Sequence, residues 1–233
     1  MGINSSSLKK TARIAGVLYL LLVITGIFGI MYIPSQIIVA GDSVSTAKNI
    51  ISNELLFRTG VFNDIISNTI FLFLVLVLYR LFKDVNENQA KLMAALVIVQ
   101  IPFVFFMEAF NITSLMILKG EILKTFELSQ RQDLAMLFLK INEYGTLPLE
   151  MFWGLWLLPF GLLVYKSVFI PRVLGILLII AGIAYMLDSF ISLLFPSYSA
   201  FVNRPTLLLV AIGEISITLW FLLKGVKSEE QKI

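Results

Sequence analysis

The chain has 233 residues, of which 58% are hydrophobic and 14% charged, and its mean hydropathy is +0.92. Soluble domains carry about one-quarter charged residues, so this composition excludes an ordinary soluble protein. The sequence contains no cysteine and no histidine. Disulfides, His-ligated zinc or haem and Ser-His-Asp catalysis are therefore excluded, and we find no cofactor signature.

Six long apolar runs account for most of the chain. A helix needs about 20 apolar residues to cross the hydrocarbon core, and backbone groups in lipid must be satisfied within each segment. Alternating strand patterns are absent. We therefore predict an all-α, polytopic integral membrane bundle that forms a single domain over residues 1–233. The predicted spans are about Ile14–Ile33, Val61–Phe82, Leu92–Leu118, Thr146–Tyr165, Arg172–Phe195 and Thr206–Leu223.

The orientation follows from basic residues in the short connections. Lys83–Lys91, Lys166–Arg172 and the segment before the first span are rich in lysine and arginine, which favours a cytoplasmic location. We predict that both termini are cytoplasmic. The first apolar run continues to Ile33, longer than the core of a signal peptide, so it should be an uncleaved anchor. The net charge of +3 comes largely from these flanks and favours contact with anionic lipid over nucleic acid.

Two loops on the predicted outer side have helical patterns. In the first, Ser45 is the predicted N-cap of a short helix that runs toward Phe57. In the second, Ser129–Gln132 matches a capping box, and the apolar stripe that follows contains Leu134, Leu137, Phe138 and Ile141. The predicted fold therefore has six transmembrane helices and two short extracytoplasmic amphipathic helices.

Five carboxylates lie inside the apolar runs, one on each predicted span except the first. They are Asp64, Glu108, Glu150, Asp188 and Glu214, and Asn111 lies one turn from Glu108. A charge at membrane depth costs about 2.5 kcal/mol or more, so these side chains should face the interior of the bundle. With Asn111 and two arginines, Arg58 and Arg204, they form the candidate binding cavity.

Arg58 and Arg204 are the arginines closest in sequence to the predicted outer ends of the acid-bearing spans. Arginine can bind a carboxylate through two hydrogen bonds. We expect at least one of them to contact one of the five acids. Its replacement should destabilise the protein more than replacement of Arg131, which we place on a solvated loop helix.

Three interpretations of the acids remain open. They are hydrogen-bonded fasteners between helices, or they line an outward-opening cavity for a cation, a cationic small molecule or protons. In the third, they hold a divalent metal of unspecified identity for chemistry on lipid or prenyl substrates. The acids are scattered one per helix, without an Asp-x-x-x-Asp pair, which argues against the third interpretation.

Several segments resemble one family. They are Arg13-Ile14-Ala15-Gly16, Phe57-Arg58-Thr59-Gly60, Phe169-Ile170-Pro171-Arg172-Val173-Leu174-Gly175 and Gly213-Glu214-Ile215 with Leu219-Trp220. In these segments, and over nearly its whole length, the chain resembles the bacterial membrane proteins grouped as domain of unknown function 4386. The resemblance implies six membrane-spanning helices and no established activity. If its motifs mark a site, Arg58 and Glu214 are the residues that lie on them.

The leading prediction is a protein of the bacterial cytoplasmic membrane that binds a cation or small cationic solute in an outward-facing acidic cavity, for transport or sensing. The alternative is a structural or accessory subunit whose acids only hold helices together. Neither prediction includes catalytic residues. The lipid bilayer is the expected partner, and the sequence does not indicate an oligomeric state.

Overall fold

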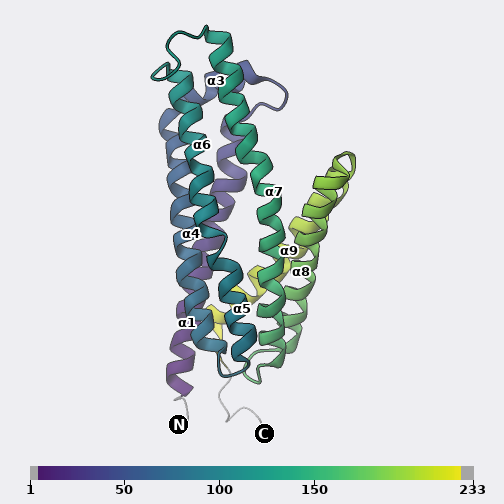
Figure 1. Cartoon of the computed structure of the whole chain (residues 1–233). Helices are drawn as coiled ribbons and strands as arrows, with labels where there is room; N and C mark the ends of the chain where they lie inside the picture. The colour runs from purple at the N-terminus through teal and green to yellow at the C-terminus, as the bar shows by residue number, and fades with distance from the viewer. Residues whose placement is uncertain (1–4, 227–233) are drawn as a thin grey trace. The chain divides into compact units, whose positions relative to one another are not determined.

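The structure is a computed structural model that describes residues 5–226, and every regular element in that range is helical (Figure 1). The elements are α1 (Ser5–Gly26), the π-helix η1 (Ile27–Tyr32), α2 (Ile33–Ile37), α3 (Ser43–Ser52), α4 (Glu54–Phe82), α5 (Glu87–Ile98), α6 (Ile101–Lys119), α7 (Leu128–Lys166), α8 (Arg172–Leu194), the 3-10 helix η2 (Pro196–Tyr198) and α9 (Ser199–Leu223).

Six helical stretches in the described range are long and apolar enough to cross a membrane. They are Ser7–Ile37, Glu54–Phe82, Glu87–Lys119, Leu128–Lys166, Arg172–Leu194 and Pro196–Leu223. Each contains one predicted apolar run or nearly all of it, so the predicted all-α fold with six spans is confirmed.

The third span is not one uninterrupted helix. It consists of α5 and α6, which are separated at Val99 and Gln100. Pro102 is the second residue of α6. A proline has no backbone N–H, and its ring clashes with the carbonyl four residues earlier, here that of Ile98. α5 therefore ends at Ile98, and α6 begins at Ile101 with Pro102 in its first turn.

The two loop helices differ in detail from their predictions. α3 begins at Ser43, and its N-cap is Asp42 rather than Ser45: Asp42 Oδ1 accepts from the Ser45 backbone N–H at 2.9 Å. The Ser45 hydroxyl also donates to Asp42 Oδ2 at 2.6 Å, and these bonds hold the pKa of Asp42 below its usual range.

The second predicted loop helix is the first third of α7, which continues without interruption to Lys166. The helix starts one residue before Ser129, and Gln130 Oε1 accepts from the backbone N–H of Glu127 at 3.0 Å. Glu127, not Ser129, thus occupies the N-cap position. No proline occurs between the predicted loop helix and the span before Pro148, so nothing in this stretch stops the helix.

The described residues form two compact units that are interleaved along the chain. The first unit comprises residues 5–21, 70–100 and 147–226, and the second comprises Leu22–Thr69 and Ile101–Thr146. α1, α4 and α7 contribute residues to both units. The arrangement of a single domain stays a prediction.

The first unit is built on an antiparallel pair, α7 and α8, whose backbones touch at two glycine pairs. A Cβ on Gly182 would lie 2.8 Å from the carbonyl oxygen of Gly154, and one on Gly175 would lie 2.6 Å from that of Gly161. α9 packs along α8 (Figure 1). Glycine permits this close approach because it has no Cβ.

Aromatic rings fill the core of the first unit. Trp156 stacks on Phe160 with ring centroids 5.3 Å apart, and Phe71 meets Trp156 edge to face at 5.0 Å. The ring centroid of Tyr19, from α1, lies 6.2 Å from that of Trp156, and Tyr19 is fully buried. Aromatic contacts of this geometry add about 0.5–1.5 kcal/mol beyond the area they bury.

The second unit has its own apolar core, formed where α2 and α3 pack against α4, α6 and α7. Its buried members are Ile33, Ile37, Ala47, Ile50, Phe57, Val61, Leu115, Ile117, Leu118 and Ala135. α3 buries Thr46, Ala47 and Ile50 and leaves Val44 exposed, as expected of an amphipathic helix.

Candidate functional site

The five carboxylates predicted to face the interior are divided between the two units. Glu150, Asp188 and Glu214 belong to the first unit, and Asp64 and Glu108 to the second. All five are buried or half-buried. Each unit can therefore be considered as a separate polar site.

The acids of the first unit all lie within electrostatic range of Tyr185 of α8. This tyrosine interacts electrostatically with all three carboxylates, which come from α7, α8 and α9, and Glu150 also interacts with Asp188. We call Tyr19, Glu150, Tyr185, Asp188 and Glu214 the tyrosine cluster. Three helices thus bring three carboxyl groups to one aromatic hydroxyl.

Hydrogen bonds satisfy the tyrosine cluster only in part. Asp188 is 5% exposed, and its Oδ1 accepts from the Ser192 hydroxyl at 3.3 Å. Glu150 Oε2 is buried and has no hydrogen-bond donor among residues 5–226. A buried carboxylate oxygen without a donor is costly.

Tyr19 is a member of the tyrosine cluster that sequence reasoning missed. Its ring lies in the aromatic core, and its hydroxyl lies within electrostatic range of the Glu214 carboxyl and of Tyr185, without a hydrogen bond to any of residues 5–226. The available signal was a polar hydroxyl in the middle of the apolar run from Ala15 to Ile24. A buried tyrosine hydroxyl normally finds a polar neighbour.

The second unit places Glu108 among side-chain amides. Asn111 Nδ2 donates to Glu108 Oε2 at 2.9 Å, one turn along α6 as predicted. Asn142 of α7 also interacts with this carboxyl and donates to the Met107 carbonyl at 3.0 Å. Glu108 is 6% exposed and interacts electrostatically with Asp64. We call Asn63, Asp64, Glu108, Asn111 and Asn142 the amide cluster.

Asp64 lies against the π-helical segment that follows α1. A Cβ on Gly29 would come within 2.6 Å of Asp64 Oδ1 and of Asn63 Nδ2. Asn63 Nδ2 donates both to Asp64 Oδ1 at 3.2 Å and to the Thr25 carbonyl at 3.0 Å. A larger residue at position 29 would therefore displace the side chains of Asn63 and Asp64. π-helical turns occur frequently at functional sites.

Other polar side chains within one turn of the acids bond to groups other than the carboxylates. Thr218 donates to the backbone carbonyl of Glu214 at 2.7 Å, and Asn68 donates to that of Asp64 at 2.9 Å. Ser67 accepts from the Thr25 hydroxyl at 3.0 Å. Polar side chains in a helix commonly bond the carbonyl one turn earlier, and sequence spacing does not distinguish this from a bond to the side chain.

The predicted contact between an arginine and one of the five acids is wrong. Arg58 Nε binds Glu54 Oε1 at 2.8 Å, and Lys119 Nζ binds the same oxygen at 3.1 Å. Arg204 is exposed and forms no ion pair within the described range. Glu54 lies one turn before Arg58 at the start of α4, where an ion pair forms without burying either charge.

Arg131 also differs from the expected solvated side chain. It is only half-exposed, and its Nε is buried without a hydrogen-bond acceptor among the described residues. Its guanidinium lies so close to Gly120 that a Cβ there would collide with it. Arg131 is therefore not a neutral reference for comparing arginine replacements.

Two surface hollows of the first unit are lined by residues other than the five acids. One is lined by Lys9, Lys10, Arg13, Ile14, Val17 and Leu18, and the other by Met151, Leu158, Ile183, Met186, Leu187 and Phe190. Within the part of the chain that the structure describes, no three acidic residues are grouped closely enough to hold a metal ion.

Comparison with known proteins supports the architecture and assigns no activity. A family model described as "Domain of unknown function (DUF4386)" matches residues 14–225. An uncharacterized protein from Archaeoglobus fulgidus is 34% identical over 80 residues, which cover 34% of this chain and 46% of that protein. The chain thus spans less than half the length of this relative. No solved structure matches.

Proposed function

Because the chain belongs to the family described as Domain of unknown function (DUF4386), whose description assigns no activity, we propose a function from its own residues. The tyrosine cluster binds a cation, a small cationic solute or protons, for transport or sensing. The protein acts as a binding protein rather than an enzyme, in the cytoplasmic membrane with both termini in the cytoplasm.

One observation carries this proposal: three carboxyl groups from three helices lie within electrostatic range of Tyr185, and no lysine or arginine of the described range pairs with any of them. Three negative charges cannot remain uncompensated in an apolar helix bundle, because each costs several kcal/mol to bury without a partner. The positive charge that compensates these carboxylates must therefore come from protons or from a bound cation. Intramembrane acids without basic partners are characteristic of ion and proton pathways.

The tyrosine also fits a cationic ligand. The Tyr185 ring meets Trp153 edge to face with centroids 5.8 Å apart, so an aromatic pair lies beside the carboxyl groups. Aromatic faces attract organic cations through the negative potential of the ring. This arrangement favours a small organic cation as well as an inorganic one.

The proposal is tested by measuring the melting temperature of the purified protein in detergent. Sodium, potassium and choline chloride are compared at constant ionic strength, from pH 5 to pH 9. A ligand at 100 times its Kd stabilises the folded state by about 2.7 kcal/mol. We expect one of these cations, or protons, to raise the melting temperature of the parent protein.

Two variants of the tyrosine cluster, Glu150→Gln and Glu214→Gln, should fold and lose this dependence, because an amide keeps shape and hydrogen bonding but has no charge to compensate. Glu108→Gln is the matched control, since it removes an intramembrane acid from the other unit. A flat response of the parent protein, or an equal loss in the control, would contradict the proposal.

A second role, fastening of helices, is favoured at the amide cluster. Asn63 of α4 donates to the Thr25 carbonyl of α1, and Asn142 of α7 donates to the Met107 carbonyl of α6. These bonds join different helices, and the amides satisfy the neighbouring carboxyl oxygens. In membrane proteins such bonds contribute about 0.6 kcal/mol each.

A further inference from the structure

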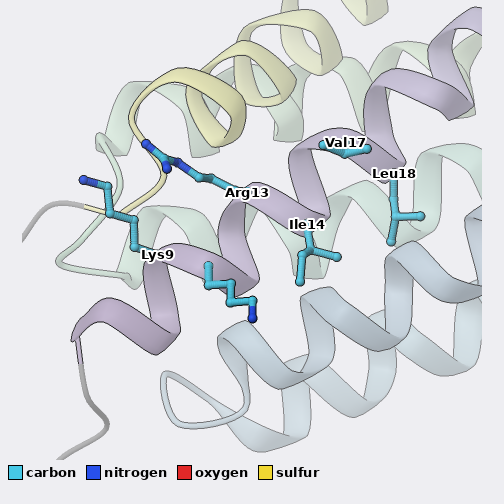
Figure 2. Close-up of a pocket in the computed structure, with 6 residues that line it drawn as sticks. Lys9, Arg13, Ile14, Val17 and Leu18 are labelled. Atoms are coloured by element: carbon cyan, nitrogen blue, oxygen red, sulfur yellow. The ribbon is translucent and has the colours of Figure 1, made fainter.

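The first turns of α1 border a hollow of about 470 Å³ that the proposed function does not use. Figure 2 shows Lys9 and Arg13 near the end of the helix and Ile14, Val17 and Leu18 further along it. Sites for small ligands have volumes of about 300–1,000 Å³, so the hollow has room for part of a lipid.

The lining residues follow two rows on the surface of the helix. Lys9, Arg13 and Val17 are four residues apart, and so are Lys10, Ile14 and Leu18. Each row begins with a cation and ends with an aliphatic side chain. From Lys9 to Leu18 the helix rises about 13 Å, so the positive charges are separated from the apolar part along one direction.

Among the residues that the structure describes, the three cations have no acidic partner. Lys9, Lys10 and Arg13 form no ion pair among residues 5–226, whereas Arg58, Lys91, Lys119 and Lys140 each bind a glutamate. All three side chains are exposed. Three positive charges within five residues repel one another, and an anion placed among them would remove that repulsion.

The helix that lines the hollow is held in place by α9. α1 packs directly on the end of α9, since a Cβ on Gly16 would lie 2.8 Å from the Leu222 backbone nitrogen. Similarly, a Cβ on Gly225 would lie 3.1 Å from Lys9 Cγ. The stem of Lys9 is therefore held against the turn after α9. The stem that carries its ammonium group is therefore fixed in place.

We propose that this hollow binds an anionic phospholipid. The phosphate lies among Lys9, Lys10 and Arg13, and an acyl chain lies along Ile14, Val17 and Leu18. A free anion would satisfy the cations only. A phospholipid also covers the aliphatic residues, of which Val17 is 51% exposed. Basic pockets at the ends of transmembrane helices are suited to anionic head groups.

The test compares lipids with identical chains added to the full-length protein in detergent. Phosphatidylglycerol should raise the melting temperature by about 3 °C more than phosphatidylcholine, and inorganic phosphate should not raise it. The triple variant Lys9→Gln, Lys10→Gln, Arg13→Gln should abolish the difference between the lipids. The charge-matched control Lys48→Gln, Lys83→Gln, Lys124→Gln removes three exposed cations elsewhere and should keep it.

Loss of three charges can alter the insertion of the first span into the membrane. A second variant therefore tests the hollow without removing any charge. Val17→Trp keeps all the cations and fills the apolar part of the hollow at an exposed position. It should also abolish the preference for phosphatidylglycerol. Equal shifts by both lipids in the parent protein, a stabilising effect of phosphate alone, or retention of the preference in Val17→Trp would each overturn the proposal.

Discussion

Tyr19 and Glu214 come from the first and last long helices of the chain and meet inside the first unit. The meeting depends on Gly16, because any larger residue there would collide with the backbone of α9 at Leu222. A single small residue thus allows a polar contact between two apolar helices. We expect this contact to be a measurable pairwise interaction.

A double-mutant cycle of Tyr19→Phe and Glu214→Gln tests this contact. The two changes remove the hydroxyl and the carboxyl without a large change in volume. We expect a coupling free energy of about 0.5–1.5 kcal/mol in reversible unfolding. The control cycle pairs Tyr19→Phe with Glu143→Gln, an exposed acid that binds Lys140, and should be additive. Additivity in both cycles would show that the two groups do not interact.

At the scale of residues, the sequence predicted which acids are buried but only some of their partners. Burial followed from membrane depth, which depends only on position within an apolar run. Spacing along one helix correctly paired Asn111 with Glu108. It could not pair Tyr19 with Glu214, because that contact depends on how distant helices pack. It also failed for Arg58, whose partner Glu54 lies outside the apolar runs.

Among the helices, the α7–α8 pair has the most specific packing. Gly154 faces Gly182, and Gly161 faces Gly175. The glycines on each helix are seven residues apart, the repeat that keeps one face of a helix toward its partner in left-handed packing. A shift of one helix by a turn would place larger side chains at these contacts. The two glycine pairs therefore set the register.

Substitution of these glycines tests the register. Gly182→Ala places a methyl group against the Gly154 carbonyl, and we expect destabilisation of about 1–3 kcal/mol in thermal or denaturant unfolding. Gly26→Ala in α1 is the matched control, since no atom lies within 4 Å of its added Cβ. There the better helix propensity of alanine should leave stability unchanged or slightly raised. Equal effects at both positions would exclude a role for close backbone packing.

The sequence predicted the middles of the membrane-spanning helices better than it predicted their ends. The apolar runs identified all six membrane-spanning stretches, because crossing a bilayer requires a minimum apolar length. Their ends depend on weaker local signals. Pro102 interrupts the third span, whereas Pro148 and Pro159 lie within α7, which continues through both. The tertiary surroundings of each proline decide between these outcomes, and the sequence does not contain them explicitly.

For the whole molecule, the basic connections predict an orientation that can be tested directly. The chain contains no cysteine, so single cysteines can be introduced without removing others. Ser129→Cys, near the start of α7, should react with an impermeant thiol reagent from outside the cell. Asn86→Cys, which lies between α4 and α5, should react only after the membrane is permeabilised. The reverse pattern would show that the orientation is inverted.

Because the two units are interleaved along the chain, their segments are completed at different times during synthesis. All segments of the second unit have been synthesised once Thr146 is complete, whereas the first unit still lacks α8 and α9 at that point. Until α9 emerges, Gly16 and Tyr19 have no packing partner from the end of the chain. We therefore expect the amide cluster to form early during synthesis and the tyrosine cluster to form only after α9 has been made.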